Sequence, residues 1–437
     1  MKPVKVGLLG LGTVGGGTVT VLHRNAAEIA RRAGRGIVIT HAAAKAYNAA
    51  AITGLDRIPK ITEDAYAVVD DPEVEIIVEL IGGYDPALEL ILRAIDNDKH
   101  VVTANKALIA KHGNEIFKAA QDKGVMVAFE AAVAGGIPII KALREGLAAN
   151  EIEWVAGIIN GTGNYILTEM RDQGRGFNDA LAQAQALGYA EADPTFDVEG
   201  IDAAHKLTIL GSIAFGIPLQ LDRTYTEGIS RIEPQDVAYA DALGYRIKHL
   251  GITRKTQQGI EQRVHPTLIP KRRLIANVDG VMNAVLVMGD AVGATLYYGA
   301  GAGSKPTASA VIADLVDVTR ALTTDPENRV PHLAFQHHAL SNARVLAIDE
   351  VVTAYYLRIQ AVDQPGVLAD ITRILGDSHI SIEAIIQKEP MEGVHHVPVI
   401  ILTQRIREQN MNEAINKIEG LDSVYGAVTR IRLEQLD

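Results

Sequence analysis

The chain opens with Val4-Lys5-Val6-Gly7-Leu8-Leu9-Gly10-Leu11-Gly12-Thr13-Val14-Gly15, and this segment sets the fold of its N-terminal region. A short apolar run, predicted to be a buried strand, leads directly into the pattern G-x-G-x-x-G formed by Gly10, Gly12 and Gly15. Glycines at this spacing allow a tight turn and let a pyrophosphate approach the backbone at a helix N-terminus. We expect a dinucleotide site here; the alternative is a turn with a purely structural role.

Short apolar segments then alternate with helical ones. Strands are predicted at residues 4–9, 37–44, 76–80, 100–103 and 125–129, and helices at 14–31, 86–97 and 108–123. This alternation predicts a parallel sheet with right-handed crossovers. Residues 1–136 are therefore expected to form a Rossmann-type, doubly wound domain.

The residue that would contact the cofactor ribose is unusual. An acidic residue about 20 positions after the glycines normally binds the ribose 2′-hydroxyl. Here no Asp or Glu occurs between Glu28 and Asp56, and Lys45 lies near the expected position. A cation without a competing carboxylate tolerates a 2′-phosphate, so NADP is slightly favoured over NAD. The alternative is that Lys45 is a solvated loop lysine.

The rest of the chain divides in two. Residues 137–325 predict an α+β substrate and dimerisation domain, whose last helix, 307–322, packs back on the first domain. A polar linker, 326–350, follows. Residues 351–437 then predict a ferredoxin-like βαββαβ unit, with strands at 354–361, 381–387, 397–403 and 424–433 and helices at 367–378 and 410–419.

Composition excludes several classes of function. The 437 residues carry a net charge of −11, which argues against a dedicated nucleic-acid binder. There is no cysteine, so thiol catalysis, thiolate metal sites and disulfides are excluded. No apolar run approaches the ~20 residues of a membrane span. We expect a cytoplasmic homodimer or homotetramer with no membrane or nucleic-acid partner.

Two lysines are candidates for proton transfer. Lys106 follows the strand 100–103, at the sheet edge where ligands of open α/β folds bind. Lys206 lies four residues after Asp202 on a predicted helix, so the two share a face. Such a pair is often only a surface salt bridge. His205 is expected to be a packed histidine rather than the base.

Four carboxylates precede or begin that helix. Glu191, Asp193, Asp197 and Asp202 could form a negative pocket that faces an ammonium group. The alternative is an acidic, solvated loop, and composition does not separate the two.

The ordered motifs of the first three quarters of the chain resemble those of homoserine dehydrogenases. They are Gly10-Leu11-Gly12-Thr13-Val14-Gly15, Thr103-Ala104-Asn105-Lys106, the segment 130–138, Asn160-Gly161-Thr162, the segment 188–194, the segment 202–207, and Gly301-Ala302-Gly303. The C-terminal Asp363-Gln364-Pro365-Gly366-Val367-Leu368 resembles an ACT domain.

The resemblance implies interconversion of L-aspartate 4-semialdehyde and L-homoserine in threonine and methionine biosynthesis. It implies that Lys206 is the general acid, assisted by Lys106. It implies a substrate site that contains Glu191, Asp202, Asp197, Gly161 and Thr162. It implies a cofactor site that includes Thr13, Val14, Lys45, Lys106, Gly188 and Gly303. The family often has arginine at the position of Lys45.

The resemblance also implies two further ligands. A monovalent cation such as sodium would lie on Val133, Gly135 and Ile137, with Glu130. An amino-acid effector, threonine by analogy, would bind the ACT domain at Asp363, Gly366 and Val367; the alternative is an ACT unit that only dimerises. Two other functions stay open: a related amino-acid-pathway dehydrogenase, and a non-catalytic, nucleotide-binding amino-acid sensor.

Overall fold

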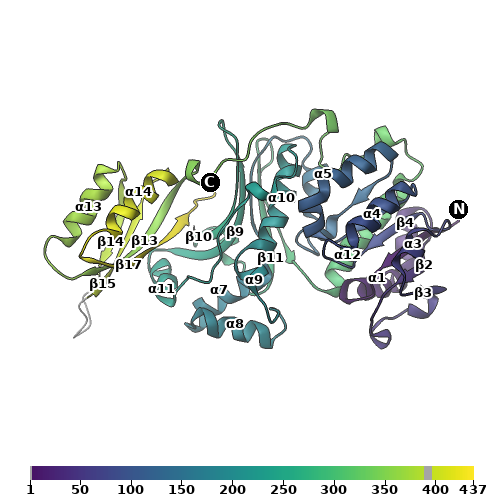
Figure 1. Ribbon diagram of the computed structural model, residues 1–437, viewed down its shortest axis with the longest axis horizontal. Helices are drawn as coiled ribbons and strands as arrows, with labels where there is room; N and C mark the ends of the chain where they lie inside the picture. Colours follow the sequence, from purple (N-terminus) through teal and green to yellow (C-terminus); the bar gives the residue numbers. More distant parts are fainter. Residues whose placement is uncertain (1, 388–395) are drawn as a thin grey trace.

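The computed structural model describes residues 2–387 and 396–437. It is elongated, with the N-terminal α/β region at one end, the C-terminal region at the other and a large sheet between them (Figure 1). Among the described residues, no helix is both long and apolar enough to cross a bilayer.

The N-terminal sheet is parallel, in the order β3-β2-β1-β4-β5-β6. This confirms the Rossmann-type prediction. The strands are β1 (Val4–Leu9), β2 (Ile37–Ala43), β3 (Lys60–Thr62), β4 (Ile76–Glu79), β5 (His100–Thr103) and β6 (Val127–Ala128). The helices are α1 (Thr13–Arg24), α2 (Ala26–Ala33), α3 (Ala65–Val69), α4 (Ala87–Asp96) and α5 (Lys106–Lys123).

Two predicted elements of this domain were wrong in extent. The helix expected over 14–31 is interrupted at Asn25, which caps α1 with φ −106° and ψ 16°. Asn competes for backbone hydrogen bonds and therefore favours such breaks. The strand expected over 125–129 is paired only at 127–128, because the backbone at Phe129 turns into a short 3-10 segment.

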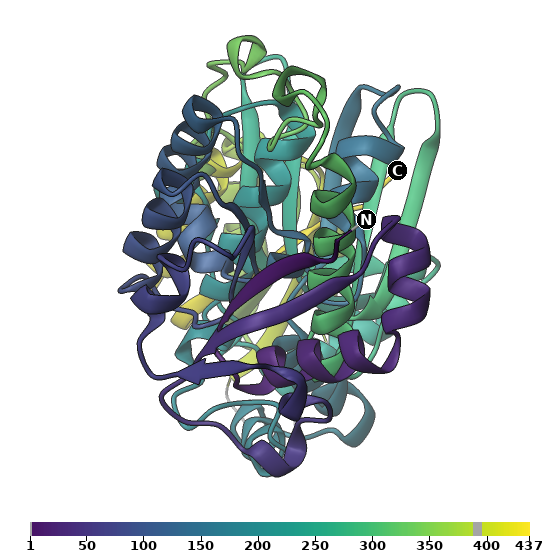
Figure 2. The ribbon, with the colours of Figure 1, turned by 90° about the vertical axis from the view of Figure 1, so that its right-hand side faces the viewer.

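Helix α12 (Ser304–Ala321) lies far along the chain but packs against the first domain (Figure 2). Its buried residues Ala308, Val311 and Leu315 share a core with Val6 and Leu8 of β1. At the start of α12, Ser304 packs closely against α1. A Cβ at Gly17 would lie only 2.4 Å from the Ser304 Oγ, so this contact requires glycine at position 17. The core of the N-terminal domain is thus completed by a helix that comes after the middle region in the sequence.

The second sheet runs through the middle and the C-terminal regions without a break. Its order is β12-β11-β7-β9-β10-β17-β13-β15-β14. Strand β10 pairs in parallel with β17, with Thr267 opposite Arg432 and Leu268 opposite Leu433. The middle strands are β7 (Ile152–Ile158), β8 (Tyr225–Thr226), β9 (Tyr245–Lys255), β10 (Ile260–Pro270), β11 (Met282–Gly289) and β12 (Gly293–Ala300). The long β9–β10 hairpin was not predicted.

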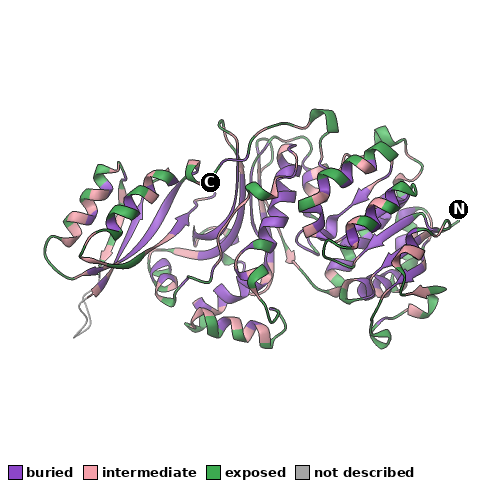
Figure 3. Cartoon of the chain, in the orientation of Figure 1, coloured by how far each residue is buried: buried purple, intermediate pink, exposed green. Residues whose placement is uncertain are grey.

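The C-terminal region has the expected βαββαβ order. Its elements are β13 (Val352–Val362), α13 (Val367–Asp377), β14 (Ile382–Gln387), β15 (His396–Thr403), α14 (Glu408–Glu419) and β17 (Val424–Leu433), with β16 (Ile406–Arg407) beside β13. Helices α13 and α14 cover one face of its sheet. The other face, through Tyr356 and Ile431, belongs to a core that it shares with α7, α8 and α11 of the middle region. Strands β13 and β15 are therefore largely buried (Figure 3).

The middle helices lie around the central sheet. They are α6 (Ile139–Lys141), α7 (Gly161–Gln173), α8 (Phe177–Ala186), α9 (Thr195–Val198), α10 (Ile201–Phe215) and α11 (Pro234–Ala242). Helix α10 is buried over nearly its whole length. It carries Asp202 and Lys206 to the boundary with the N-terminal domain.

Candidate active site

The three motif glycines have different physical roles. Gly10 has φ +99°, and a Cβ there would lie 2.7 Å from the Leu80 carbonyl oxygen. A Cβ at Gly15 would lie 2.0 Å from the Gly10 carbonyl oxygen, so both positions require glycine for packing. A Cβ at Gly12 would meet nothing within 4 Å. The first amides of α1, which no side chain caps, thus border open space that a pyrophosphate can enter.

The other predicted cofactor residues come from separate segments of the chain. The Ser304 hydroxyl donates to the Thr13 carbonyl oxygen at 2.9 Å, which places neighbouring Gly303 beside the glycine turn. Lys45 is exposed just after β2. Gly188 is also exposed, with φ +74°, in the turn after α8 of the middle region.

Lys106 is the first residue of α5, and its backbone is held on both sides. The Asn105 side chain accepts from the Leu108 amide at 3.1 Å and donates to the Gly83 carbonyl oxygen at 2.6 Å. The Thr103 hydroxyl donates to buried Glu79 at 2.6 Å. These contacts fix Lys106 at the carboxyl end of the parallel sheet, where the sequence predicted it.

One carboxylate joins the two candidate lysines. Lys206 Nζ lies 2.6 Å from Asp202 Oδ2 and donates to the Ile159 carbonyl oxygen at 2.7 Å. Lys106 Nζ, from the other domain, lies 3.0 Å from Asp202 Oδ1. Asp202 is 2% exposed and Lys206 9% exposed. The pair is therefore a buried cluster at a domain boundary and not a surface salt bridge.

Burial and charge set the protonation of this cluster. Burial lowers the pKa of Lys206 below its usual value, and Asp202 only partly opposes this. Burial also acts to lower the pKa of Lys106, but the charge of Asp202 outweighs it and the pKa is raised. Despite burial, the two ammonium groups hold the pKa of Asp202 well below its ordinary range. Lys206 is thus the amine of the pair that can release a proton most easily.

Asn160, which belongs to one of the motifs that carry the resemblance but was not predicted as a site residue, organises the carboxylates. Its Nδ2 donates to Asp197 Oδ1 at 2.7 Å and to Asp202 Oδ2 at 2.8 Å. Its Oδ1 accepts from the Gly163 amide at 2.8 Å and so caps α7. Asn before a helical run is a capping signal that could have identified it. Burial raises the pKa of Asp197.

The four predicted acids do not form one buried pocket. Asp197 and Asp202 lie together, whereas Glu191 and Asp193 are exposed in the turn between α8 and α9. The Thr162 hydroxyl donates to the Tyr189 carbonyl oxygen at 2.6 Å, which attaches that turn to α7. Glu191 therefore lies on a loop held next to the cluster.

Two neighbouring residues complete the local packing. A Cβ at Gly161 would lie 2.7 Å from the Val281 carbonyl oxygen, so glycine allows α7 to start against that strand. His205 is buried, and its ring lies 5.3 Å from that of Phe196. Burial lowers the pKa of His205, which agrees with its expected role as a packed, neutral histidine.

The predicted cation loop has a strained backbone. Ala134 and Gly135 have φ of +54° and +47°, and a Cβ at Gly135 would approach the Gly301 carbonyl oxygen to 2.4 Å. Within the described residues, the carbonyl oxygens of Val133 and Gly135 accept no hydrogen bond, whereas that of Ile137 accepts from Ile139 at 2.8 Å. No cluster of three His, Asp or Glu suited to a metal occurs in the same residues.

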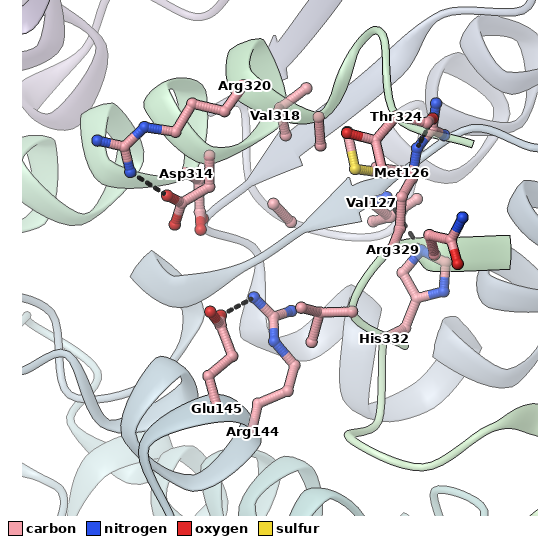
Figure 4. A pocket seen from close by; sticks show the side chains of 15 residues that line it. Met126, Val127, Arg144, Glu145, Asp314, Val318, Arg320, Thr324, Arg329 and His332 are labelled. Atoms are coloured by element: carbon pink, nitrogen blue, oxygen red, sulfur yellow. Dashed lines mark hydrogen bonds and ion pairs between the residues drawn. The ribbon is translucent and has the colours of Figure 1, made fainter. Parts of the chain in front are cut away.

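Glu130 lies beside this loop in an acidic, buried setting. Its two carboxylate oxygens accept from the Ile140 and Lys141 amides at 2.9 and 2.8 Å, and burial raises its pKa to about 7. The Glu130 amide donates to Asp314 of α12 at 2.8 Å. Asp314 and Arg144 border a separate cavity of about 280 Å³ (Figure 4).

The predicted effector loop lies at the start of α13, away from the catalytic cluster. Gly366 has φ +98°, and a Cβ there would meet nothing within 4 Å. Asp363 is exposed and accepts from the Gln387 side chain at 3.2 Å. Val367 is the first residue of the helix.

Comparison with known proteins decides the family. The homoserine dehydrogenase NAD-binding domain matches residues 10–130, the homoserine dehydrogenase catalytic domain matches 138–316, and the ACT domain matches 355–420. A homoserine dehydrogenase of Pseudomonas aeruginosa is 67% identical over 437 residues, which is 100% of both chains. The chain belongs to the homoserine dehydrogenase family.

Further relatives agree over the full length. A homoserine dehydrogenase of Neisseria gonorrhoeae is 55% identical, covering 100% of both chains. The crystal structure of a homoserine dehydrogenase from Thiobacillus denitrificans superposes with a TM-score of 0.95, at 67% identity, over 100% of this chain and 99% of that one. The enzyme is thus an oxidoreductase of amino-acid biosynthesis with a nicotinamide-binding domain and an ACT domain. The two alternative functions, a non-catalytic amino-acid sensor and a related dehydrogenase with a different substrate, are not favoured.

Proposed function

We propose that Lys206 and Lys106 serve the interconversion of L-aspartate 4-semialdehyde and L-homoserine, with Lys206 as the proton donor. The observation that carries this assignment is the single buried carboxylate, Asp202, shared by the two lysines at 2.6 and 3.0 Å. The cluster lies where α5 and α10 come together.

A bound reduced nicotinamide would supply the hydride that the aldehyde carbon takes up in the direction of reduction. Lys206 Nζ gives its proton to the carbonyl oxygen, so that an alcohol forms and no alkoxide is left in a buried site. The lowered pKa of Lys206 favours this transfer. Lys106 keeps its charge, because its pKa is raised, and steadies the negative charge that develops on the oxygen.

The substrate ammonium group needs acidic partners. Both oxygens of Asp202 are already within ion-pair distance of lysines, so we assign this group chiefly to Glu191 and Asp197, with Asp202 completing the negative field. Gly161 and Thr162 shape the wall of the same site.

The cofactor contacts follow from the glycine turn. Thr13, Val14 and Gly12 would hold the pyrophosphate, with Gly303, Gly188 and Lys106 nearer the nicotinamide. Exposed Lys45, with no carboxylate in its segment, supports NADP as the preferred cofactor over NAD. A monovalent cation such as sodium would use the free carbonyl oxygens of Val133 and Gly135, with Ile137 and Glu130, in a structural role.

Regulation is assigned to the ACT domain. We propose that threonine binds at Asp363, Gly366 and Val367, because a Cβ at Gly366 would meet nothing within 4 Å and no side chain caps the start of α13. Inhibition requires tighter binding of threonine to the less active state. The enzyme would act in the cytoplasm as a homodimer or homotetramer.

The test is nicotinamide absorbance with purified protein and L-homoserine, using NADP and NAD in parallel, each with and without threonine. We expect turnover on homoserine but not on malate or serine, faster with NADP, and slowed by threonine. Turnover on malate with none on homoserine would overturn the substrate assignment, and equal rates with both cofactors would overturn the role of Lys45.

A further inference from the structure

A second cleft, of about 940 Å³, lies between the ACT domain and the segment that leads into the active-site helix α10. One wall consists of α14 and β17 of the ACT domain. The other consists of residues 225–232 and of Glu199 and Ile201, just before Asp202. Neither Asp363 nor Gly366 lines it, so it is separate from the effector loop proposed above.

Two charged side chains in this cleft lack partners. Among the described residues, neither the Glu199 carboxylate nor the Arg231 guanidinium makes a hydrogen bond or ion pair. Other charges in the same walls are paired: Glu227 lies 2.8 Å from Arg432, and Arg430 lies 3.2 Å from Glu408. Glu419, a further carboxylate of these walls, accepts from the Val428 amide at 2.7 Å. Within the part of the chain that the structure describes, one negative and one positive side chain of the cleft are thus left without a hydrogen bond or ion pair.

We propose that this cleft binds a small zwitterion, a free α-amino acid, at a second regulatory site between the ACT and catalytic domains. Arg231 suits a carboxylate because its planar guanidinium can donate two parallel hydrogen bonds. Glu199 suits an ammonium group. Ser230, Asn416 and Thr429 line the same space and offer uncharged hydrogen-bonding groups to the rest of the ligand.

A chain of direct contacts links the cleft to the helix that carries the catalytic cluster. The Ile229 amide donates to the Val198 carbonyl oxygen at 2.9 Å, which ties the cleft wall to α9. A Cβ at Gly228 would lie 2.3 Å from Glu199 Oε2, so this wall packs directly on the residues before α10. A ligand that draws Glu199 towards itself acts on the start of the helix that carries Asp202 and Lys206. This consequence, unlike binding itself, rests on the proposed catalytic roles.

Isothermal titration of the full-length enzyme tests the proposal, because it reports binding without catalysis. The probes are L-threonine, L-methionine, L-lysine and L-isoleucine, and the N-acetyl and methyl-ester forms of whichever amino acid binds. The proteins are wild type, Arg231→Gln, Ser230→Trp and, as the matched effector-loop variant, Asp363→Asn. Arg231 and Ser230 are exposed, so these variants should fold, which circular dichroism checks.

We expect at least one amino acid to bind with an affinity that falls ~10-fold or more in Arg231→Gln and Ser230→Trp, as loss of a charge-assisted contact predicts. That binding should survive in Asp363→Asn and be lost when either charged end of the ligand is blocked. Binding of none of the four probes, or binding that only Asp363→Asn weakens, would overturn the proposal. Loss of turnover in a Lys206 variant would leave these isotherms unchanged, so the two assignments fail separately.

Discussion

Two buried ion clusters of this enzyme are built from different cations, and they behave differently. At the catalytic boundary, two lysines share the one carboxylate of Asp202, and Asn160 adds a hydrogen bond. At the junction of the ACT domain and the central sheet, Arg263 contacts Glu261 and Glu434 at 3.0 and 2.5 Å. Arg432 contacts Glu227 at 2.8 Å and is also paired with Glu408.

The comparison shows why the lysine cluster is suited to proton transfer and the arginine cluster to structural support. Arginine keeps its proton, and its planar fork can satisfy two carboxylates at once. Arg254 and Arg430 also pair with Glu434 and Glu408, each at 3.2 Å, so the junction has as many cations as carboxylates and holds β10 to β17. Lysine shifts its pKa readily on burial, and a cluster with more ammonium groups than carboxylates favours release of a proton. The predictions below change one cluster at a time.

The largest effect is expected from Lys206→Ala. Loss of the proton donor should lower kcat by ~10²–10⁴-fold while NADPH binding is kept. Lys206→Arg is the matched variant, since it keeps the charge but cannot release a proton, and it should be nearly as inactive. Steady-state kinetics and fluorescence titration with NADPH measure the two quantities. Near-normal turnover in Lys206→Ala would rule out this proton donor.

Glu434→Gln should lower the free energy of unfolding and leave catalysis almost unchanged. Leaving Arg263 with one carboxylate in a buried site should cost about 3–5 kcal/mol, seen as a lower thermal midpoint, with kcat of the folded enzyme little changed. Asp122→Asn, in an exposed pair with Lys118, is the control and should cost less than ~1 kcal/mol. An equal loss in both variants would show that the junction does not depend on its charges.

The same residue predicts an acid dependence. Although burial opposes it, Arg263 and Arg254 lower the pKa of Glu434 from 4.5 to about 2 in the folded state. A lowered folded-state pKa stabilises above pH 4.5, and this stabilisation is lost as the pH falls from 4.5 towards 2. Glu434→Gln should therefore lose less stability than wild type across that window, measured by denaturation at stepped pH. Equal losses of stability in wild type and Glu434→Gln would contradict the assignment of this acid dependence to Glu434.

Asp202→Asn should move the pH profile of the reaction. Reduction of the semialdehyde needs protonated Lys206, so its rate falls as the pH rises through the pKa of that amine. Burial lowers this pKa and Asp202 raises it, so removal of the carboxylate should shift the alkaline limb to lower pH. The profile of kcat/KM for reduction measures the shift. If the alkaline limb did not shift, the ionisation that it reports would not be that of Lys206.

Lys45 is expected to have the smallest effect. An exposed cation near a phosphate contributes about 0.2–1 kcal/mol, so Lys45→Ala should reduce the NADP-over-NAD preference by about 2- to 5-fold. Lys45→Arg should increase the preference, because guanidinium binds phosphate with two hydrogen bonds. The ratio of kcat/KM for the two cofactors provides the measurement. A ratio that neither change alters would make Lys45 a solvated loop residue.

Local patterns in the sequence predicted much of the architecture. The glycine turn, the alternation of strands and helices and the βαββαβ order each depend on residues close together in the chain, where periodicity and turn chemistry act directly. The spacing of Asp202 and Lys206 likewise predicted their shared helix face. The break at Asn25 was missed because propensity alone locates helix ends poorly.

What only the tertiary structure decided depends on residues far apart in the chain. Lys106 meets Asp202 because α5 and α10 come together across a domain boundary, and no local spacing encodes that contact. Pairing of β10 with β17 makes one sheet of two predicted domains, and the register of such a pair is set by packing and not by local sequence. The tertiary structure then distinguishes side chains of the same charge: Glu191 is exposed and Asp202 is buried, and the pKa of Lys206 is lowered whereas that of Lys106 is raised. The sequence by itself thus determined which groups are present, and long-range packing decided which of them meet and with what charge.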